Sequence, residues 1–453
     1  MKKIIFIFFL GYIVGYTQNN QLLYNFTGLP QTLMLNPGAK VNNQFFFGFP
    51  MVSRVSLQGG FTGFSTYDIF ADNGLDINDK IVAALNNYGK TEFIAVNQLL
   101  EILYAGFRLP NNRYLSFGYY QEIDLLAKIP KDLVDLFYEG NTVLNRKYSI
   151  KKLRARAEML GVLHVGLSKK VNNKWQIGAR AKLYSSVFNI KSTGNTGSIY
   201  TESGTNNTFN QHLANVNFLV QTSGLILEDD IDFDTAYLKK NLLFGGSFGL
   251  GFDIGFTHQL KEQWELSASL QDIGFISNTK SIESYKVMGD FEIEGFQIYF
   301  DADNPEDYWN DLEEEFEEDV VSETIYDKYL SLGPIKFNGA LSYSFGKTYD
   351  DCRFLMDSDI YNNKIGFHLY ANMSGAHTYL ATTLFYERRI NGNFSSKITY
   401  TIDPYIYTNI GLGLSTQFGA FNMYILADNL LNLNNMYNAK SASFQLGFNF
   451  IFS

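Results

Sequence analysis

The chain has 453 residues, a formal net charge of −10 and an aromatic fraction of 16%. Charged residues make up 18% of the chain, below the roughly 25% of average soluble domains, so the composition fits neither a disordered chain nor an ordinary soluble enzyme. The single cysteine excludes an intramolecular disulfide.

The N-terminus predicts a secretory signal peptide over residues 1–18. Two lysines precede an apolar run from Ile4 to about Val14, and small or polar residues follow it. A membrane-anchor helix is the weaker interpretation, because the run is shorter than the ~20 residues that a span needs. No later stretch approaches 18 consecutive apolar residues. The exported chain is therefore either a soluble secreted β protein or a transmembrane β-barrel.

The main strand signal is a period of two in hydrophobicity. In residues 245–258, large apolar residues occupy every even position from 248 to 256, and small or polar residues occupy the odd positions. Residues 263–272 show the same alternation after the short KEQ turn, so the two runs predict a hairpin. The pattern recurs at 173–186, 335–345 and 364–373. Several runs cover about 9–11 residues, the length with which a tilted strand crosses a bilayer.

These two-faced strands favour a barrel over a soluble sandwich. Their apolar face is rich in aromatic residues, whereas their polar face carries many Gly, Ser and Asn residues. In an outer-membrane barrel the apolar face contacts lipid and the polar face lines a wet lumen. Closure also leaves no edge strand, which removes the need for disulfides. We expect an all-β fold, a transmembrane antiparallel up-and-down β-barrel with some helical segments in its long loops.

The alternating runs number about 14, within a range of roughly 12 to 16. Short turns at PNNR (110–113), VNN (171–173) and KEQ (261–263) are expected in the periplasm, and long segments outside the cell. After residue 335 the connections are short and include GKTYDD and YNNK, and the count then leaves the C-terminus on the wrong side. One strand is therefore missed or invented, and we place this error within 276–300. The long segments are about 61–101, 122–159, 189–242 and 276–334.

An acidic helix is predicted in the last long segment. Asn304 and Pro305 are suited to the helix start, and residues 306–319 carry nine acidic and no basic residues. The helix is a candidate for binding a basic partner or divalent ions, but charge runs are usually solvated loop surfaces. DADNPED (301–307) has part of the spacing of a calcium loop and lacks its glycine.

Alternation assigns a set of polar side chains to the lumen. They either tune what passes through a pore or form an internal lattice of salt bridges that fills a narrow barrel, and the lattice is slightly favoured. His368 and His377 flank a turn, but the five histidines have no metal-ligand spacing. The lumen-facing candidates are Arg108, Arg180, Lys182, Asp253, Glu265, Lys336 and His368.

No catalytic motif is present, so we expect neither an enzyme nor a cofactor. G-x-S-x-G, P-loop, zincin and GxGxxG patterns are all absent from the sequence. No metal site and no nucleic-acid partner are expected.

The C-terminal ASFQLGFNFIFS predicts the last strand. Its aromatic stripe is expected to face lipid, with Gln445, Gly447 and Asn449 towards the lumen and Ile451 breaking the polar face. A terminal aromatic strand also resembles the signal that the outer-membrane insertion machinery reads. The assembly-signal residues are Phe444, Phe448, Phe450 and Phe452.

Several segments together resemble a family of uncharacterised outer-membrane proteins from Bacteroidetes. The resemblance is carried by LPQTLMLNPGAK (29–40), GYYQEIDLLAKIPKDLVDLFYEGN and GVLHVGLSKKVNNKWQIGARAKLYSS. The NPG stretch is similar to the NPA of FadL-type fatty-acid channels and PorV-type secretion-system barrels, although a turn before the first strand also explains it. The resemblance implies a barrel over residues 19–453 with its N-terminal segment near or inside the barrel.

The expected function is that of a non-enzymatic subunit or accessory of a larger outer-membrane assembly, in secretion or outer-membrane biogenesis. Bulky connections and the lack of an evident wide polar channel favour this hypothesis. The alternative is a FadL-like transporter of small hydrophobic molecules. The expected partners are outer-membrane lipid, other outer-membrane or periplasmic proteins and, during biogenesis, the insertion machinery.

Overall fold

The computed structural model describes residues 19–141, 143–204, 209–225, 234–293, 322–347, 361–375, 377–405, 407–431 and 437–452. The predicted signal peptide and the acidic segment with its DADNPED stretch lie outside these ranges. Among the helices of the described ranges, none has the length and hydrophobicity to cross a membrane.

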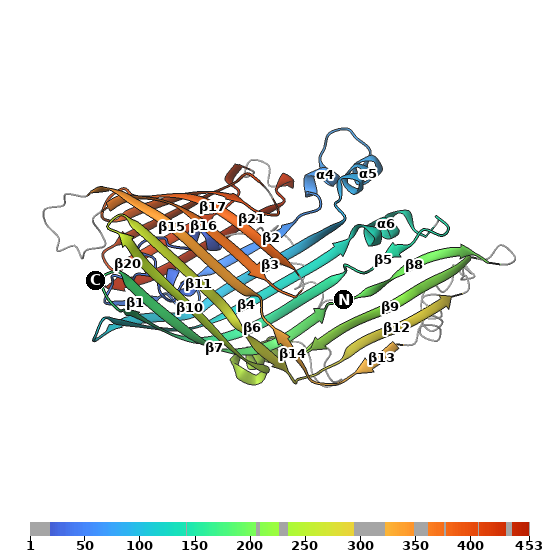
Figure 1. Ribbon diagram of the computed structural model, residues 1–453, viewed down its shortest axis with the longest axis horizontal. Coiled ribbons are helices and arrows are strands. Elements are labelled where there is room, and N and C mark those ends of the chain that lie inside the picture. Colours follow the sequence, from blue (N-terminus) through green and yellow to red (C-terminus); the bar gives the residue numbers. More distant parts are fainter. Residues whose placement is uncertain are drawn as a thin grey trace.

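The wall is a closed antiparallel barrel of 14 strand positions (Figure 1). Closure occurs where the last strand, β21, pairs with β1 and β2. Two positions hold two strands each, because β1 and β2 lie in line between the same neighbours, and β14 and β15 follow one another along β11. In chain order the wall strands are β1 (Phe45–Gly48), β2 (Val55–Phe61), β3 (Thr91–Leu109), β4 (Arg113–Pro130), β6 (Arg154–Lys170), β7 (Trp175–Ser192), β10 (Ser247–Lys261), β11 (Trp264–Asn278), β14 (Tyr329–Leu332), β15 (Ile335–Lys347), β16 (Tyr361–Met373), β17 (Thr378–Arg389), β18 (Phe394–Ile402), β19 (Asn409–Phe418), β20 (Phe421–Ala427) and β21 (Ser441–Phe452).

The predicted barrel of about 14 strands is confirmed, and the structure corrects the strand count that did not close. YNNK is not a turn but the start of β16, and Tyr361 there pairs with Lys347 at the end of β15. GKTYDD and YNNK therefore flank one connection instead of two. The range 276–300 does contain a strand, but that strand belongs to a second sheet and not to the wall. A closed barrel also excludes the soluble sandwich.

The second sheet extends the barrel at the end opposite the C-terminus (Figure 1). It is linked to the wall through the pairing of β7 with β9. Three helices also lie in the long connections at this end, which in barrels of this class is the extracellular end. The sheet consists of β5 (Tyr148–Ser149), β8 (Thr196–Ser203), β9 (Phe209–Ser223), β12 (Ser284–Ile293) and β13 (Ser322–Ile325). The three helices are α4 (Thr66–Phe70), α5 (Ile77–Asn87) and α6 (Lys131–Glu139). The connection between β9 and β10 contains α7 (Thr235–Lys240) and η2 (Asn241–Gly245).

The two faces of the wall differ as a membrane barrel requires. On β10 the side chains of Phe248, Leu250 and Phe252 are exposed on the outside, whereas Ser247 and Asp253 on the opposite face are buried. An apolar exterior around a polar interior is stable only where lipid replaces water outside. The structure is thus an outer-membrane type of β-barrel.

The interior is occupied by the N-terminal segment. Residues 19–41, here called the plug, precede the first wall strand and include α2 (Asn19–Leu23) and α3 (Thr32–Leu35). Most of their apolar side chains are buried, and those of α2 and its neighbours pack with Ala340, Tyr424 and Leu426 from the inner face of the wall. The plug therefore supplies the apolar core that an ordinary water-filled lumen lacks.

Candidate functional site

Side chains of the wall hold the plug by its backbone carbonyls. Arg180 donates to the carbonyls of Leu33 and Met34, the latter over 3.0 Å. Lys397 donates to the Tyr24 carbonyl over 2.6 Å. Because α2 and α3 are single turns, many plug carbonyls have no helical partner, and these cations satisfy them in the buried interior.

A pair of wall glycines receives the Asn36-Pro37-Gly38 turn. Gly178 of β7 and Gly255 of β10 are direct register partners on the inner face. A Cβ atom on Gly178 would lie 2.0 Å from the Pro37 carbonyl oxygen, and one on Gly255 would lie 2.1 Å from Asn36 Oδ1. The turn is therefore not merely a lead-in to β1, because it lies against a part of the wall where only glycine leaves room.

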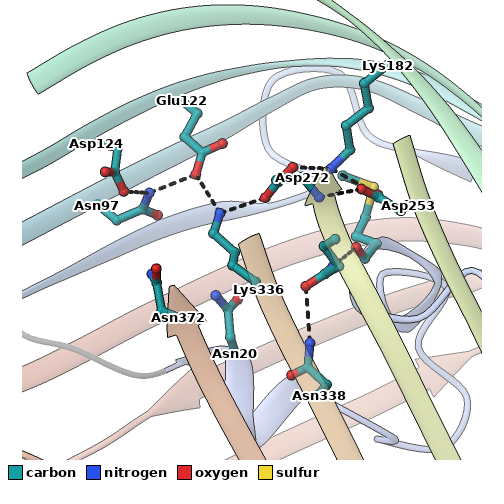
Figure 2. Close-up of polar contacts among 12 residues, drawn as sticks. Asn20, Asn97, Glu122, Asp124, Lys182, Asp253, Asp272, Lys336, Asn338 and Asn372 are labelled. Carbon is teal, nitrogen blue, oxygen red and sulfur yellow. Dashed lines mark hydrogen bonds and ion pairs between the residues drawn. The ribbon is translucent and has the colours of Figure 1, made fainter. Parts of the chain in front are cut away.

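A chain of buried ion pairs crosses the inner face above this contact (Figure 2). Asp253 contacts Arg180 at 3.2 Å and Lys182 at 2.9 Å, and all three side chains are at most 4% exposed. Lys182 also reaches Asp272 at 2.5 Å. The charges are thus compensated inside the barrel, which is the condition for burying them.

The same chain continues across the barrel to a second group of charges. Lys336 bridges Asp272 at 2.9 Å and Glu122 at 3.5 Å. Asn97 donates to Glu122 over 2.8 Å and to Asp124 over 3.2 Å (Figure 2). Residues from β3, β4, β7, β10, β11 and β15 are joined in this way, so the network ties distant strands of the wall together.

The wall has a gap beside this network. The ladder between β11 and β15 ends at Gln271 with Lys336, and pairing resumes between Phe275 and Leu332 of β14. The interval contains Gly333 and Pro334, the latter without a backbone N–H. On β11 the backbone of Asp272 has a φ of +59°, and its N–H donates inward to Asp253 Oδ1 over 2.8 Å. Asp272 and Pro334 therefore present no backbone hydrogen-bond donor to lipid at the gap.

Two cavities with shared lining residues lie beside this gap. The lumenal cavity, of about 600 Å³ including space open to solvent, lies against Asn20 and Gln21 of the plug. The gap cavity, of about 390 Å³ measured in the same way, is lined by inward Asp272 and by Phe275, whose ring is exposed on the lipid face. Both cavities are lined by Asp124, Pro334 and Lys336.

Comparison with known protein families identifies the family of this chain. The sequence model described as "Family of unknown function (DUF5723)" matches residues 37–428. The chain belongs to the DUF5723 family. No curated protein matches it.

Solved structures similar to this DUF5723 protein include two toluene transporters and a FadL homologue. The toluene transporter TbuX of Ralstonia pickettii has a TM-score of 0.43 at 8% identity, with 94% of each chain covered. A FadL homologue of Pseudomonas aeruginosa has a TM-score of 0.44 at 9% identity, with 94% of each chain covered. The P. putida toluene transporter TodX has a TM-score of 0.36 at 10% identity, with 96% of this chain and 92% of that chain covered.

The seven polar residues assigned to the lumen of the DUF5723 barrel all contact the plug or the ion-pair network. Arg180, Lys182, Asp253 and Lys336 form the network itself. Arg108 donates to the carbonyls of Val41 and Asn42 over 3.0 and 3.1 Å. Glu265 forms an ion pair with Lys40 at 2.6 Å. The His368 ring stacks on Tyr24 with 4.4 Å between ring centroids, and its Nε2 atom lies 3.1 Å from Asn338 Oδ1.

His368 and His377 occupy different surroundings, because the ring of His377 packs on Phe93. No group of residues in the described ranges is arranged to hold a metal ion.

The predicted assembly-signal residues lie on β21, where Phe444 and Phe452 are exposed on the outside and Phe452 pairs with Phe45 of β1. Their reading by an insertion machinery stays a prediction.

Sequence reasoning found Asp253 but missed other acidic residues at or next to the network. Glu122, Asp124 and Glu158 fall within or at the border of the segment assigned to a long connection (122–159), but β4 continues to Pro130 and β6 begins at Arg154. The alternation of Glu122 and Asp124 with Ile123 and Leu125 was the signal that could have found them.

Proposed function

We propose that this protein is a non-enzymatic bacterial outer-membrane channel that passes small hydrophobic molecules between its lumen and the membrane through the gap between β11 and the β14–β15 position. The observation that carries the proposal is the pair of cavities at the interrupted ladder, which share lining residues, one reaching Asn20 and Gln21 of the plug and the other Phe275, whose side chain is exposed on the outside. A molecule that enters from outside meets the plug and is diverted sideways.

Two features make a sideways route physically reasonable. The plug packs tightly against the wall, so the path along the barrel axis is filled with buried side chains. At the gap, the outer rim is apolar, with Phe275 and Leu332 both exposed. The N–H of Asp272 is satisfied inside and Pro334 has none, so opening the wall here does not leave these donors in hydrocarbon.

Filling the gap is expected to stop transport. A Cβ on Gly333 would have only the Asp272 carbonyl oxygen nearby, at 3.6 Å, so the first side-chain atom of Gly333→Trp meets no backbone clash beside the gap. We expect the variant to reduce the protein-dependent rate of pyrene uptake into outer-membrane vesicles to the background of vesicles without the protein. Pyrene is a neutral hydrocarbon, and its excimer fluorescence reports its arrival in the membrane.

The matched control places the same side chain away from the gap. Gly375, in the turn between β16 and β17, has no atom within 4 Å of a built Cβ, so Gly375→Trp should fold and transport like the unmodified protein. Equal uptake by the Gly333→Trp and Gly375→Trp variants would refute the lateral route.

A second function is favoured by the second sheet. Within the described residues, its outer strands β5 and β13 each pair on one side only, which leaves backbone edges available for another protein. We propose, as the second candidate, that the barrel is a subunit or accessory of a larger outer-membrane assembly. Extraction in mild detergent followed by size-exclusion chromatography would show a large complex under this hypothesis and a monomer without it.

A further inference from the structure

One segment of the chain lies on the outer face of the wall. Tyr120, Val162 and Tyr184 are register partners on β4, β6 and β7, and their side chains are buried inside the barrel. Because side chains alternate between the two faces of a strand, the adjacent Gly161 and Ser185 face outward. Ser185 is nevertheless only 1% exposed, because the backbone of η2 lies over it.

Hydrogen bonds hold η2 against the wall (yellow-green coil near β7 in Figure 1). The Ser185 hydroxyl donates to the Asn241 carbonyl, and the Tyr119 hydroxyl donates to the Leu242 carbonyl over 2.7 Å. A Cβ atom on Gly161 would lie 2.3 Å from the Leu242 carbonyl oxygen, so a larger residue there would push the segment away. The wall is thus shaped to carry η2 on its outside.

The segment lies at the extracellular edge of the lipid-facing belt. Ser185 is the register partner of Phe248, the first of the large apolar side chains that β10 directs outward as far as Phe256. The span between them is close to the roughly 9–11 residues with which a tilted strand crosses a bilayer. The exposed side chains of η2 are Leu243 and Phe244, at 64% and 49%. Both therefore lie where the hydrocarbon of the outer leaflet meets its headgroups.

The backbone of Phe244 has a conformation that large side chains avoid. Its φ is +69°, in the left-handed region, and its ring lies 6.4 Å from the ring of Tyr119 between centroids. Strain of this kind persists only where the surroundings enforce it, and it is concentrated at functional positions. Here the enforced turn presents an aromatic ring to lipid.

Three lysines lie beside this apolar turn. Lys239 and Lys240, both exposed, end α7 directly before η2. The exposed Lys280 belongs to the same surface, because its carbonyl accepts from the Gly224 N–H, and the Gly224 carbonyl accepts from Tyr237 of α7. Within the described part of the chain, none of the three lysines forms an ion pair with a carboxylate. Lysines next to an inserted apolar group favour a membrane surface with anionic headgroups.

We propose that the α7–η2 segment binds a phosphorylated glycolipid of the outer leaflet. The lysines are at the level of its phosphate groups, which they neutralise as point charges. The acyl chains pack on Leu243 and Phe244, and on the lipid-facing Phe248 below them. This lipid site lies on the outside of the wall and does not depend on the proposed lateral route.

The first test compares two probes on the mature protein in phosphatidylcholine nanodiscs. The discs contain increasing mole fractions of bisphosphorylated lipid A or of the same glycolipid without phosphates. Native mass spectrometry counts the glycolipid molecules that remain on the protein. We expect half occupancy at an about tenfold lower mole fraction of the phosphorylated probe. Equal retention of the two probes would overturn the proposal.

A double variant tests the lysines. Lys239→Gln with Lys240→Gln should weaken the retention of phosphorylated lipid A about tenfold or more and leave the phosphate-free probe unchanged. Lys169→Gln with Lys170→Gln is the matched control, because these adjacent exposed lysines lie at the opposite end of the wall. In the sequence, four acidic residues (228–232) precede α7 and are the competing partners of its lysines. If they occupy the lysines, the first variant retains lipid A normally and the proposal fails.

Two further variants test the apolar turn. Phe244→Gly suits the positive φ but lacks the ring, so it should weaken lipid A retention several-fold, whereas a purely structural role of Phe244 predicts no loss. In a Cys352→Ser background, a fluorescent label on Leu243→Cys should be quenched by lipids with a nitroxide on the acyl chain. The same label on Met288→Cys, an apolar site of β12 that is 55% exposed, should not be quenched. An unquenched label on Leu243→Cys would show that the turn lies in water and would refute the lipid site.

Discussion

Replacing Asp253 with asparagine is expected to lower the free energy of unfolding of the barrel by about 3–5 kcal/mol, the range found when one partner of a buried ion pair is removed. Asp253 is fully buried and accepts from Arg180, Lys182 and the backbone N–H of Asp272. The substitution keeps the size of the side chain but leaves two buried cations short of a negative charge. Equilibrium unfolding in guanidinium chloride, followed by tryptophan fluorescence in micelles, measures the change.

Two further variants show whether the burial of the pair is responsible. Glu262→Gln removes a carboxylate from an ion pair with Lys347 at the end of the same strands, where both side chains are more than half exposed. This control should leave the unfolding midpoint unchanged, because water and salt screen exposed pairs. Arg180→Gln combined with Asp253→Asn should cost less than the sum of the single changes, with a coupling energy of about 0.5–3 kcal/mol. Simple additivity would show that the two charges do not depend on each other.

The barrel could be predicted from the sequence because lipid imposes a strict rule on every membrane-crossing residue. On β10 the even positions face lipid and carry large apolar side chains, whereas the odd positions face inward and carry small or polar ones. From Phe248 to Phe256 this alternation has no exception. Outside the bilayer the rule no longer applies. Strands such as β3, with 19 residues, extend beyond the 9–11 that the membrane requires. The sequence therefore predicts their ends poorly, and the second sheet was assigned to loops.

The site was harder to predict for the same reason. Asp272 adopts a positive φ, which is uncommon for a residue other than glycine and is fixed here by tertiary contacts with Asp253 and Lys182. The Gly333-Pro334 dipeptide marks a break in the chain, but only the pairing of β11 with both β14 and β15 shows that the break lies in the wall. Long-range registers of this kind leave no periodic pattern in one sequence.

The plug also explains a residue that the alternation rule could not accommodate. Ile451 interrupts the polar face of β21, and in the structure it is buried inside the barrel with Phe46, Tyr104 and Tyr114. Plug residues Leu33 and Met34 belong to the same cluster. An inward apolar residue is anomalous for a water-filled lumen but suits a lumen that is filled by protein. Such exceptions to alternation are the signal by which an internal plug can be sought in related sequences.

Substituting Gly178 with leucine is expected to displace the plug and open the barrel along its axis. A Cβ at this position would lie 2.0 Å from the Pro37 carbonyl oxygen and 2.8 Å from the Gly38 nitrogen, so the clash is with backbone and no side-chain rotation relieves it. Overpacking costs about 1–3 kcal/mol, which raises the population of the displaced plug about five- to 150-fold. The 14-strand wall is held by its own hydrogen bonds, so the plug should move before the wall does.

Two readouts decide whether the plug is the closure of the barrel. Leu33, buried at 2% exposure, is changed to cysteine in a Cys352→Ser background, and its reaction with a maleimide should become about five- to 150-fold faster with Gly178→Leu. Ion-conducting steps in planar bilayers should appear in the same variant, and deletion of residues 19–41 should make them constant. Gly339→Leu serves as the control, because a Cβ at this outward position would meet only the ring of Phe337 at 3.0 Å. Faster labelling without conductance would contradict the role of the plug as the closure. The plug would then move, but the ion-pair network on the wall would still block the passage of ions through the lumen.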